Sequence, residues 1–280
     1  MLHGPASGTS TPGSAHRTLV PCGSSTGHNA GVSVDLHYLW FGGGLLAMTA
    51  LTLGLGRWAR IGLGLFPLWA MLRAVVQLTA IALLLRGILA VPWTVAAFVV
   101  VMLSTASWTA MGRLNELWHG RRTAVLGVLS GALVTLVVIF ALRLVDFQVR
   151  YLVAVAGIII GNSMSAATLA GRNFLRSARA HSTEVEAWLS LGATPARAHE
   201  EIGREAVRES LLPNLDQTKS TGLVTLPGAF VGALFGGASP AQAAQFQLVV
   251  LAGIALTMTV TGLVVTRLAG RTPYVAHGRV

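Results

Sequence analysis

The chain has 280 residues, of which 53% are hydrophobic and 11% are charged, and its mean hydropathy is +0.66. The charged fraction is less than half of the ~25% typical of soluble domains, so the composition excludes an ordinary water-soluble enzyme and a disordered chain. The formal net charge is +10. Because the cations fall between long apolar runs, they indicate a membrane surface rather than nucleic acid as the partner.

Residues 1–33 are rich in Gly, Ser, Thr and Pro, which predicts a disordered N-terminal tail. A transmembrane domain is predicted at 34–270 and a C-terminal tail at 271–280. Seven apolar runs lie in the domain: 34–56, 67–86, 93–112, 123–142, 151–170, 220–237 and 246–266. Most of them reach the ~20 residues that a helix needs to cross the hydrocarbon core. The predicted fold class is all-α, a polytopic membrane protein with about seven transmembrane helices.

The sixth run is the weakest, because it has only ~18 residues and contains Pro227 and five glycines. A broken or re-entrant helix is the alternative there. The arginines and the single lysine predict the orientation. With the N-terminus outside, 15 of these cations lie in inside segments and 4 in outside segments, in accord with the positive-inside rule. We therefore expect a multi-pass protein of the cytoplasmic (inner) membrane, with its N-terminus out and its C-terminus in.

The only long polar stretch within the domain is 172–219, which holds seven cations and seven anions. It falls on the inside in this orientation and is expected to form a cytosolic helical loop. Two helices are predicted, separated near Gly192, with Thr194 as the N-cap of the second and Pro195 in its first turn. The second helix is expected to end at about Leu212, before the proline that follows. Such an element is either a solvated connector or a docking element for a soluble partner.

One motif in this stretch resembles the EAA-type coupling loop of ABC transporter permeases. It reads Glu186-Ala187-x-x-x-Leu191-Gly192-Ala193-Thr194-Pro195. Further blocks stand at 73–78, 157–164, 222–228 and 237–240. Taken in order, these blocks are similar to the iron-export permease family known as FetB, whose plant relatives are linked to aluminium tolerance. The resemblance covers roughly residues 60–270.

The resemblance implies the permease subunit of an ATP-driven ABC transporter, which pairs with a second copy of itself and with ABC ATPase subunits. It also implies export of iron or resistance to metal stress. In such permeases a short cytosolic helix sits in a groove of the ATPase. The residues expected to couple to the ATPase are therefore Glu186, Ala187, Leu191, Gly192, Ala193, Thr194 and Pro195. Gly192 is also expected to be the left-handed C-cap of the first helix, and a plain connector is the alternative.

The sequence contains no P-loop, because its single lysine, Lys219, does not follow the glycines that cradle phosphates. No nucleophile–base pair can be proposed either. We therefore expect no catalytic residues and no cofactor in this chain, with ATP hydrolysis left to a separate partner chain. The chain is expected to be a non-enzymatic subunit that contacts membrane lipid and no nucleic acid.

Polar residues within the apolar runs are the candidates for a translocation path. Arg73 and Gln77 lie one turn apart, where a polar path and snorkelling to the interface are the alternatives. Asn162, Ser163 and Met164 interrupt the fifth run, where they either contact the cargo or lock helices together. The metal ligands stay unknown, because no predicted span holds Asp or Glu well inside the membrane, whereas iron favours carboxylate or His ligands.

Glycines one turn apart predict close helix packing, either within the chain or at a dimer face. The pairs are Gly127/Gly131, Gly157/Gly161, Gly228/Gly232 and Gly232/Gly236. The competing functions are a stand-alone secondary transporter or channel and a membrane scaffold. A secondary transporter predicts an ion-coupling carboxylate at mid-membrane, and the predicted spans contain none.

Overall fold

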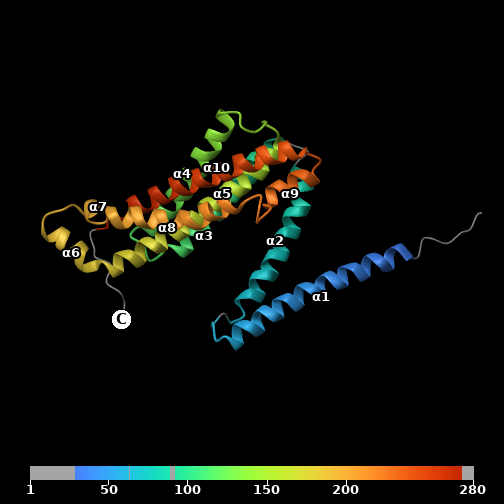
Figure 1. Cartoon of the computed structure of the whole chain (residues 1–280), viewed down its shortest axis with the longest axis horizontal. Coiled ribbons are helices and arrows are strands. Elements are labelled where there is room, and N and C mark those ends of the chain that lie inside the picture. Colours follow the sequence, from blue (N-terminus) through green and yellow to red (C-terminus); the bar gives the residue numbers. More distant parts are fainter. Residues whose placement is uncertain (1–28, 63, 89–91, 273–280) are drawn as a thin grey trace, which may run out of the picture. The chain divides into compact units, whose positions relative to one another are not determined.

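The computed structural model describes residues 29–62, 64–88 and 92–272, with side chains at 39–62, 64–83 and 94–272. The described residues form ten α-helices and no strand (Figure 1). The helices are α1 (Asn29–Trp58), α2 (Phe66–Ile88), α3 (Pro92–Arg113), α4 (Gly120–Ala141), α5 (Val149–Ala180), α6 (Ser182–Ser190), α7 (Pro195–Ala198), α8 (Glu200–Ser220), α9 (Gly228–Phe235) and α10 (Pro240–Ala269). Both predicted tails lie largely outside the described residues, and α1 begins at Asn29, inside the range predicted as tail.

The chain divides into two units, Met1–Ile81 and Ala82–Val280. The first unit contains α1 and most of α2, and Gly62 and Gly64 adopt left-handed backbone in the turn between them. Apolar residues are spread around both helices rather than gathered on one face. Large apolar side chains are exposed, including Trp58 and Trp69. Helices that are apolar all round suit lipid, where the backbone must satisfy its own hydrogen bonds.

The second unit is a bundle in which α3, α5 and α10 run in the same direction. Leu114, directly after α3, packs on Gly171 of α5, and Met102, about three turns earlier on α3, packs near Gly157. At the starts of α5 and α10, the rings of Tyr151 and Phe246 are 5.7 Å apart. We call the end where α5 and α10 begin the far end, and the end where they finish the coupling end.

Helices α4 and α8 run the opposite way along α10. Gly127 of α4 faces Val265, and Gly131 faces Thr257 and Thr261, so the residue number rises on one helix as it falls on the other. The packing is close, since a Cβ at Gly131 would lie 1.9 Å from the Oγ1 of Thr261. The prediction of packing within the chain is therefore confirmed for this glycine pair, which lets two helices approach backbone to backbone.

Other glycines of the predicted pairs have room beside them. A Cβ at Gly161, Gly228 or Gly232 would meet no atom within 4 Å, and at Gly157 it would only touch Met102. Buried alanines provide further small residues in the core of the bundle. Fully buried examples come from three different helices: Ala110, Ala124, Ala132, Ala166, Ala167 and Ala170.

The described residues contain six helices that are long and apolar enough to cross a membrane: α1, α2, α3, α4, α5 and α10. The prediction of a polytopic all-α membrane protein is confirmed. The run at 220–237 does not form a seventh span of this kind. It contains turns and the eight-residue helix α9, which is only ~12 Å long at 1.5 Å per residue. The glycines and Pro227 break it, as the alternative interpretation held.

The predicted second helix of the polar stretch, from Pro195 to about Leu212, is divided at His199 into α7 and α8, and α8 runs further than predicted. It was expected to end at about Leu212, but α8 continues through Pro213 to Ser220. A proline inside a helix removes one backbone hydrogen bond. Here the helix packs along α5 and α10 (Figure 1), and this packing outweighs the local preference.

Candidate coupling site

The predicted coupling residues lie on α6, on the turn after it and at the start of α7, a segment that we call the coupling hairpin (182–198). Gly192 has φ +86° and directly follows the last turn of α6. Its N–H donates to the Leu189 carbonyl, and the Ala193 N–H donates to the Trp188 carbonyl, both at 3.0 Å. This is a Schellman ending, in which the left-handed residue is usually glycine. The predicted C-cap role of Gly192 is confirmed.

The start of α7 also follows the prediction. Thr194 occupies the N-cap position with extended backbone, and Pro195 follows in the first helical position, where its fixed φ suits a helix start. The hairpin presents several of its residues to solvent. Leu191 is 81% exposed, Glu186, Ala187, Gly192 and Thr194 are exposed, and Ala193 and Pro195 are half-buried. Trp188, at 47%, is the other large apolar side chain exposed on the hairpin.

The inner side of the hairpin is anchored to the bundle. Val185 of α6 and Ala198 of α7 are buried. His199 follows directly, is 2% exposed, and donates from Nδ1 to the Pro195 carbonyl at 2.8 Å. Its ring lies 5.8 Å from the ring of Phe174 of α5. A Cβ at Gly270, just after α10, would come within 3.3 Å of His199, so this histidine packs against both helices.

Replacing His199 with alanine is expected to lower the free energy of unfolding by about 2–4 kcal/mol, because it leaves a cavity and removes a buried hydrogen bond. Thermal unfolding of the purified full chain in detergent measures the change. His181→Ala is the matched control, since His181 lies nearby but is exposed, and it should change stability by less than about 0.5 kcal/mol. Equal midpoints for the two variants would contradict the anchoring role.

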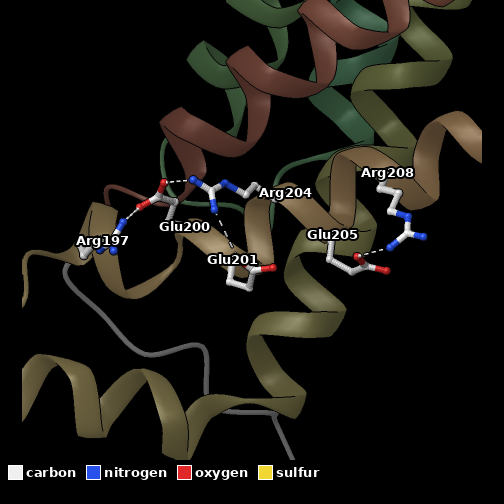
Figure 2. A network of polar contacts seen from close by, with 6 residues as sticks. All are labelled: Arg197, Glu200, Glu201, Arg204, Glu205 and Arg208. Atoms are coloured by element: carbon white, nitrogen blue, oxygen red, sulfur yellow. Dashed lines mark hydrogen bonds and ion pairs between the residues drawn. The ribbon is translucent and has the colours of Figure 1, made fainter.

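Ion pairs surround the hairpin on α7 and on the first turns of α8 (Figure 2). Glu200 bonds to Arg197 and Arg204, and Arg204 also reaches Glu201 at 3.5 Å. The hydrogen bond donated by Arg197 holds the pKa of the Glu200 carboxyl below its ordinary value; the charges of Arg197, Arg204 and Arg267 act the same way, and partial burial opposes them. A lowered pKa stabilises the fold above the carboxyl's ordinary pKa and loses this effect as the pH falls through the folded value, so the network is intact at neutral pH.

The predicted path residues fall into two groups, one in each unit. Arg73 and Gln77 are exposed on α2. Asn162 donates to the Ile158 carbonyl and Ser163 to the Ile160 carbonyl, each at 2.8 Å, and Ser163 is fully buried. Met164 packs against the hydrophobic core. Polar groups that bond to their own helix need no partner from another helix, and the assignment of these five residues to a path stays a prediction.

Sequence reasoning missed a group of buried hydroxyls between α4 and α10. Thr135, Thr257 and Thr261 are fully buried, and their Oγ1 atoms have no hydrogen-bond partner among the described atoms. The repeat of Thr at i and i+4 beside the glycines of α4 is the sequence pattern that could have revealed them. The described residues contain no group of three or more His, Cys, Asp or Glu side chains that could hold a metal ion.

A bundle of membrane-length helices with a short anchored hairpin at one end defines a multi-pass, all-α membrane protein. The chain belongs to the uncharacterised protein family UPF0014, whose profile matches residues 43–274. This membership confirms the resemblance drawn from the sequence blocks. No solved structure matches the chain.

Three relatives illustrate the family. The UPF0014 membrane protein STAR2 of Oryza sativa subsp. japonica is 34% identical over 225 residues, 79% of each chain. Protein ALUMINUM SENSITIVE 3 of Arabidopsis thaliana is 32% identical over 204 residues, 72% of this chain and 74% of the relative. The probable iron export permease protein FetB of Escherichia coli (strain K12) is 29% identical over 209 residues, 74% of this chain and 81% of the relative.

Proposed function

We propose that the chain is the permease subunit of an ATP-driven ABC transporter, in which two copies combine with two ATPase chains in the cytoplasmic membrane. The observation that carries the proposal is the coupling hairpin, which is exposed at Leu191 and anchored to α5 and α10 through His199. Membrane helices do not hydrolyse ATP themselves, so a separate ATPase needs a docking element that is firmly attached to them. A short helix with an exposed tip and a buried base has this form.

The proposed cargo is a metal ion, with iron first, and the proposed direction is export. The support is the FetB relative, whose name states iron export, and the Arabidopsis relative, whose name states aluminium sensitivity. A cell that lacks the gene should therefore accumulate more iron under iron stress than a cell that carries it. Equal iron contents in the two strains would remove iron as the cargo.

The energy source is tested with the full chain and an ABC ATPase chain from the same cells, reconstituted together in sealed vesicles. Metal movement is expected to require ATP and the ATPase, and to persist after an ionophore collapses the ion gradients. Transport by the chain alone, driven by a gradient, would instead establish the secondary transporter. Omitting the ATPase from otherwise identical vesicles is the matched control.

A further inference from the structure

The path of the chain between α5 and α10 places an unusual demand on the segment that joins them. Helix α5 finishes at the coupling end, whereas α10 begins at the far end. The chain must therefore return along the whole bundle between Ala180 and Pro240. Among the described helices of this segment, only α8 is long enough, because its 21 residues span ~31 Å, close to the ~30 Å of the hydrocarbon core.

Contacts with α10 fix the depth of α8. A Cβ at Gly203 would lie 3.4 Å from Thr266, and a Cβ at Gly262 would lie 3.3 Å from Val207. The two helices are therefore antiparallel, and each step toward the C-terminus of α8 corresponds to one step toward the N-terminus of α10. Extending this register places Ser220 at the depth of Val249. Helix α10 is a candidate span over its full length, so α8 runs beside its apolar middle. Figure 1 shows α8 along the bundle, with α6 and α7 at one end of it and α9 toward the other.

The two sides of α8 differ in chemistry. The side that packs on the bundle is small and buried, with Gly203, Ala206, Val207 and Ser210. The opposite side carries charge toward both ends of the helix, with the exposed Leu212 and Leu215 between the two charged parts. Its charged residues are Glu201, Arg204, Glu205, Arg208, Glu209, Asp216 and Lys219. Four of these are carboxylates whose spacing places them within roughly 80° of arc on a helix that turns 100° per residue.

The charges form ion pairs at the surface rather than in the core. Arg208 pairs with Glu205 at 3.8 Å, as Figure 2 shows, and Lys219 pairs with Asp216 at 3.1 Å. The side chain of Asp216 is 66% exposed and that of Lys219 is 78% exposed. Charged side chains at membrane depth face a bundle interior or a water-filled cavity, because exposure to lipid is costly. Elsewhere on the bundle, the exposed residues of α4 beyond Arg122 at its start are apolar, including Leu133 and Val137.

We propose that α8 crosses the membrane and that its charged face lines a water-filled path through the protein. The charged side chains make contact with lipid unfavourable, whereas water can solvate them. The identity of the cargo rests on the proposed function, but a wall that carries carboxylates in excess suits a hydrated cation, since hard metal ions prefer oxygen ligands. The carboxylates that the apolar runs lack are thus supplied by a helix with too little apolar character to be recognised as a span.

Cysteine accessibility tests the proposal without any transport measurement. The chain has a single cysteine, Cys22, so Cys22→Ser gives a cysteine-free full chain for single replacements. Leu212→Cys on α8 and Leu133→Cys on α4 form a matched pair. The two leucines are 44% and 49% exposed, and the contact registers place both level with Thr257 of α10. The probe is a charged, membrane-impermeant maleimide applied to sealed vesicles.

Leu212→Cys is expected to react at least about tenfold faster than Leu133→Cys, because the reactive thiolate forms in water and not in hydrocarbon. Glu201→Cys and Lys219→Cys are expected to react from opposite sides of the membrane. Reaction of both ends from one side would overturn the crossing. Equal protection of the two leucine positions, or cross-linking of two copies through Leu212→Cys without labelling, would overturn the water-filled path.

These outcomes are independent of the proposed function. Labelling needs neither the ATPase nor cargo, so a failed transport assay leaves the path intact, and a failed labelling experiment leaves ATP-driven transport intact. The path also places Glu205, Glu209 and Asp216 on the wall, which removes the lack of a membrane carboxylate as an argument against gradient-driven transport. The vesicle experiment with ATP decides between these energy sources.

Discussion

Replacing Gly192 with tryptophan is expected to abolish ATP-driven transport while leaving membrane insertion intact. A Cβ at Gly192 would meet no atom within 4 Å, so the indole projects outward at the exposed turn where we expect the ATPase to dock. The residue has φ +86°, and left-handed backbone costs a non-glycine residue only about 1–2 kcal/mol. The measurement is ATP-dependent metal transport and ATPase binding in vesicles that contain equal amounts of each variant.

Gly192→Asn is the matched control for backbone strain. Asparagine tolerates the left-handed conformation better than other residues with a Cβ and adds little bulk to the turn. It is expected to retain at least half of the transport, whereas the tryptophan variant retains almost none. If both variants transport at the normal rate and bind the ATPase, the coupling hairpin is a plain connector.

Replacing Gly131 with alanine is expected to lower the free energy of unfolding by about 1–3 kcal/mol, because a single added methyl overpacks the contact of α4 with α10. The new Cβ would lie 1.9 Å from the Thr261 Oγ1 and 2.9 Å from the Thr257 backbone carbonyl oxygen. The hydroxyl can move, but the carbonyl of a helix cannot. Thermal unfolding of the full chain in detergent provides the measurement.

Gly112→Ala provides the comparison, because Gly112 also lies in a membrane-length helix and its Cβ would meet nothing within 4 Å. It is expected to leave stability unchanged or to raise it by up to about 1 kcal/mol. Adding Thr261→Ala to Gly131→Ala should recover part of the loss, since it removes the closer of the two contacts. Equal midpoints for Gly131→Ala and Gly112→Ala would show that the helices do not pack as described.

Much of the fold could be predicted because a helix that crosses lipid needs a long run of apolar residues, which is visible in the sequence. Six of the seven apolar runs correspond to membrane-length helices. The coupling hairpin could also be predicted from the sequence. Gly192 suits the left-handed backbone that ends α6, and Pro195 has the fixed φ that suits the start of α7. Local rules of this kind operate within a few residues, and they predicted the ends of α6 and α7 well.

The rest depends on tertiary packing, which hydropathy does not record. The run at 220–237 was counted as a span because it is apolar, although its glycines and Pro227 confine helix to eight residues. Helix α8 was expected to end before Pro213, yet it continues to Ser220 while it packs on α5 and α10 through residues such as Val207 and Ser210. A hydropathy scale does not identify a membrane-crossing helix such as the one we propose for α8, because one of its sides is covered by protein and the other is charged.

The candidate residues differ in how far local sequence could place them. The sequence correctly separated Gly192 and Thr194 as turn residues, because their conformations are local. It could not distinguish a path role for Asn162 from a structural one, since both require a polar atom in an apolar helix. In the structure that atom bonds to the carbonyl of Ile158. The buried His199 escaped notice because its anchoring depends on Phe174 and Gly270, which are distant in sequence.

The single-residue joint between α7 and α8 has a mechanical consequence. Only His199 separates the two helices, and it is wedged against Phe174 and the end of α10. No slack segment stands between the turn at Gly192 and the helix that returns along the bundle. If the ATPase docks at this turn as we propose, we expect its movement to reach α8 through a single residue, His199.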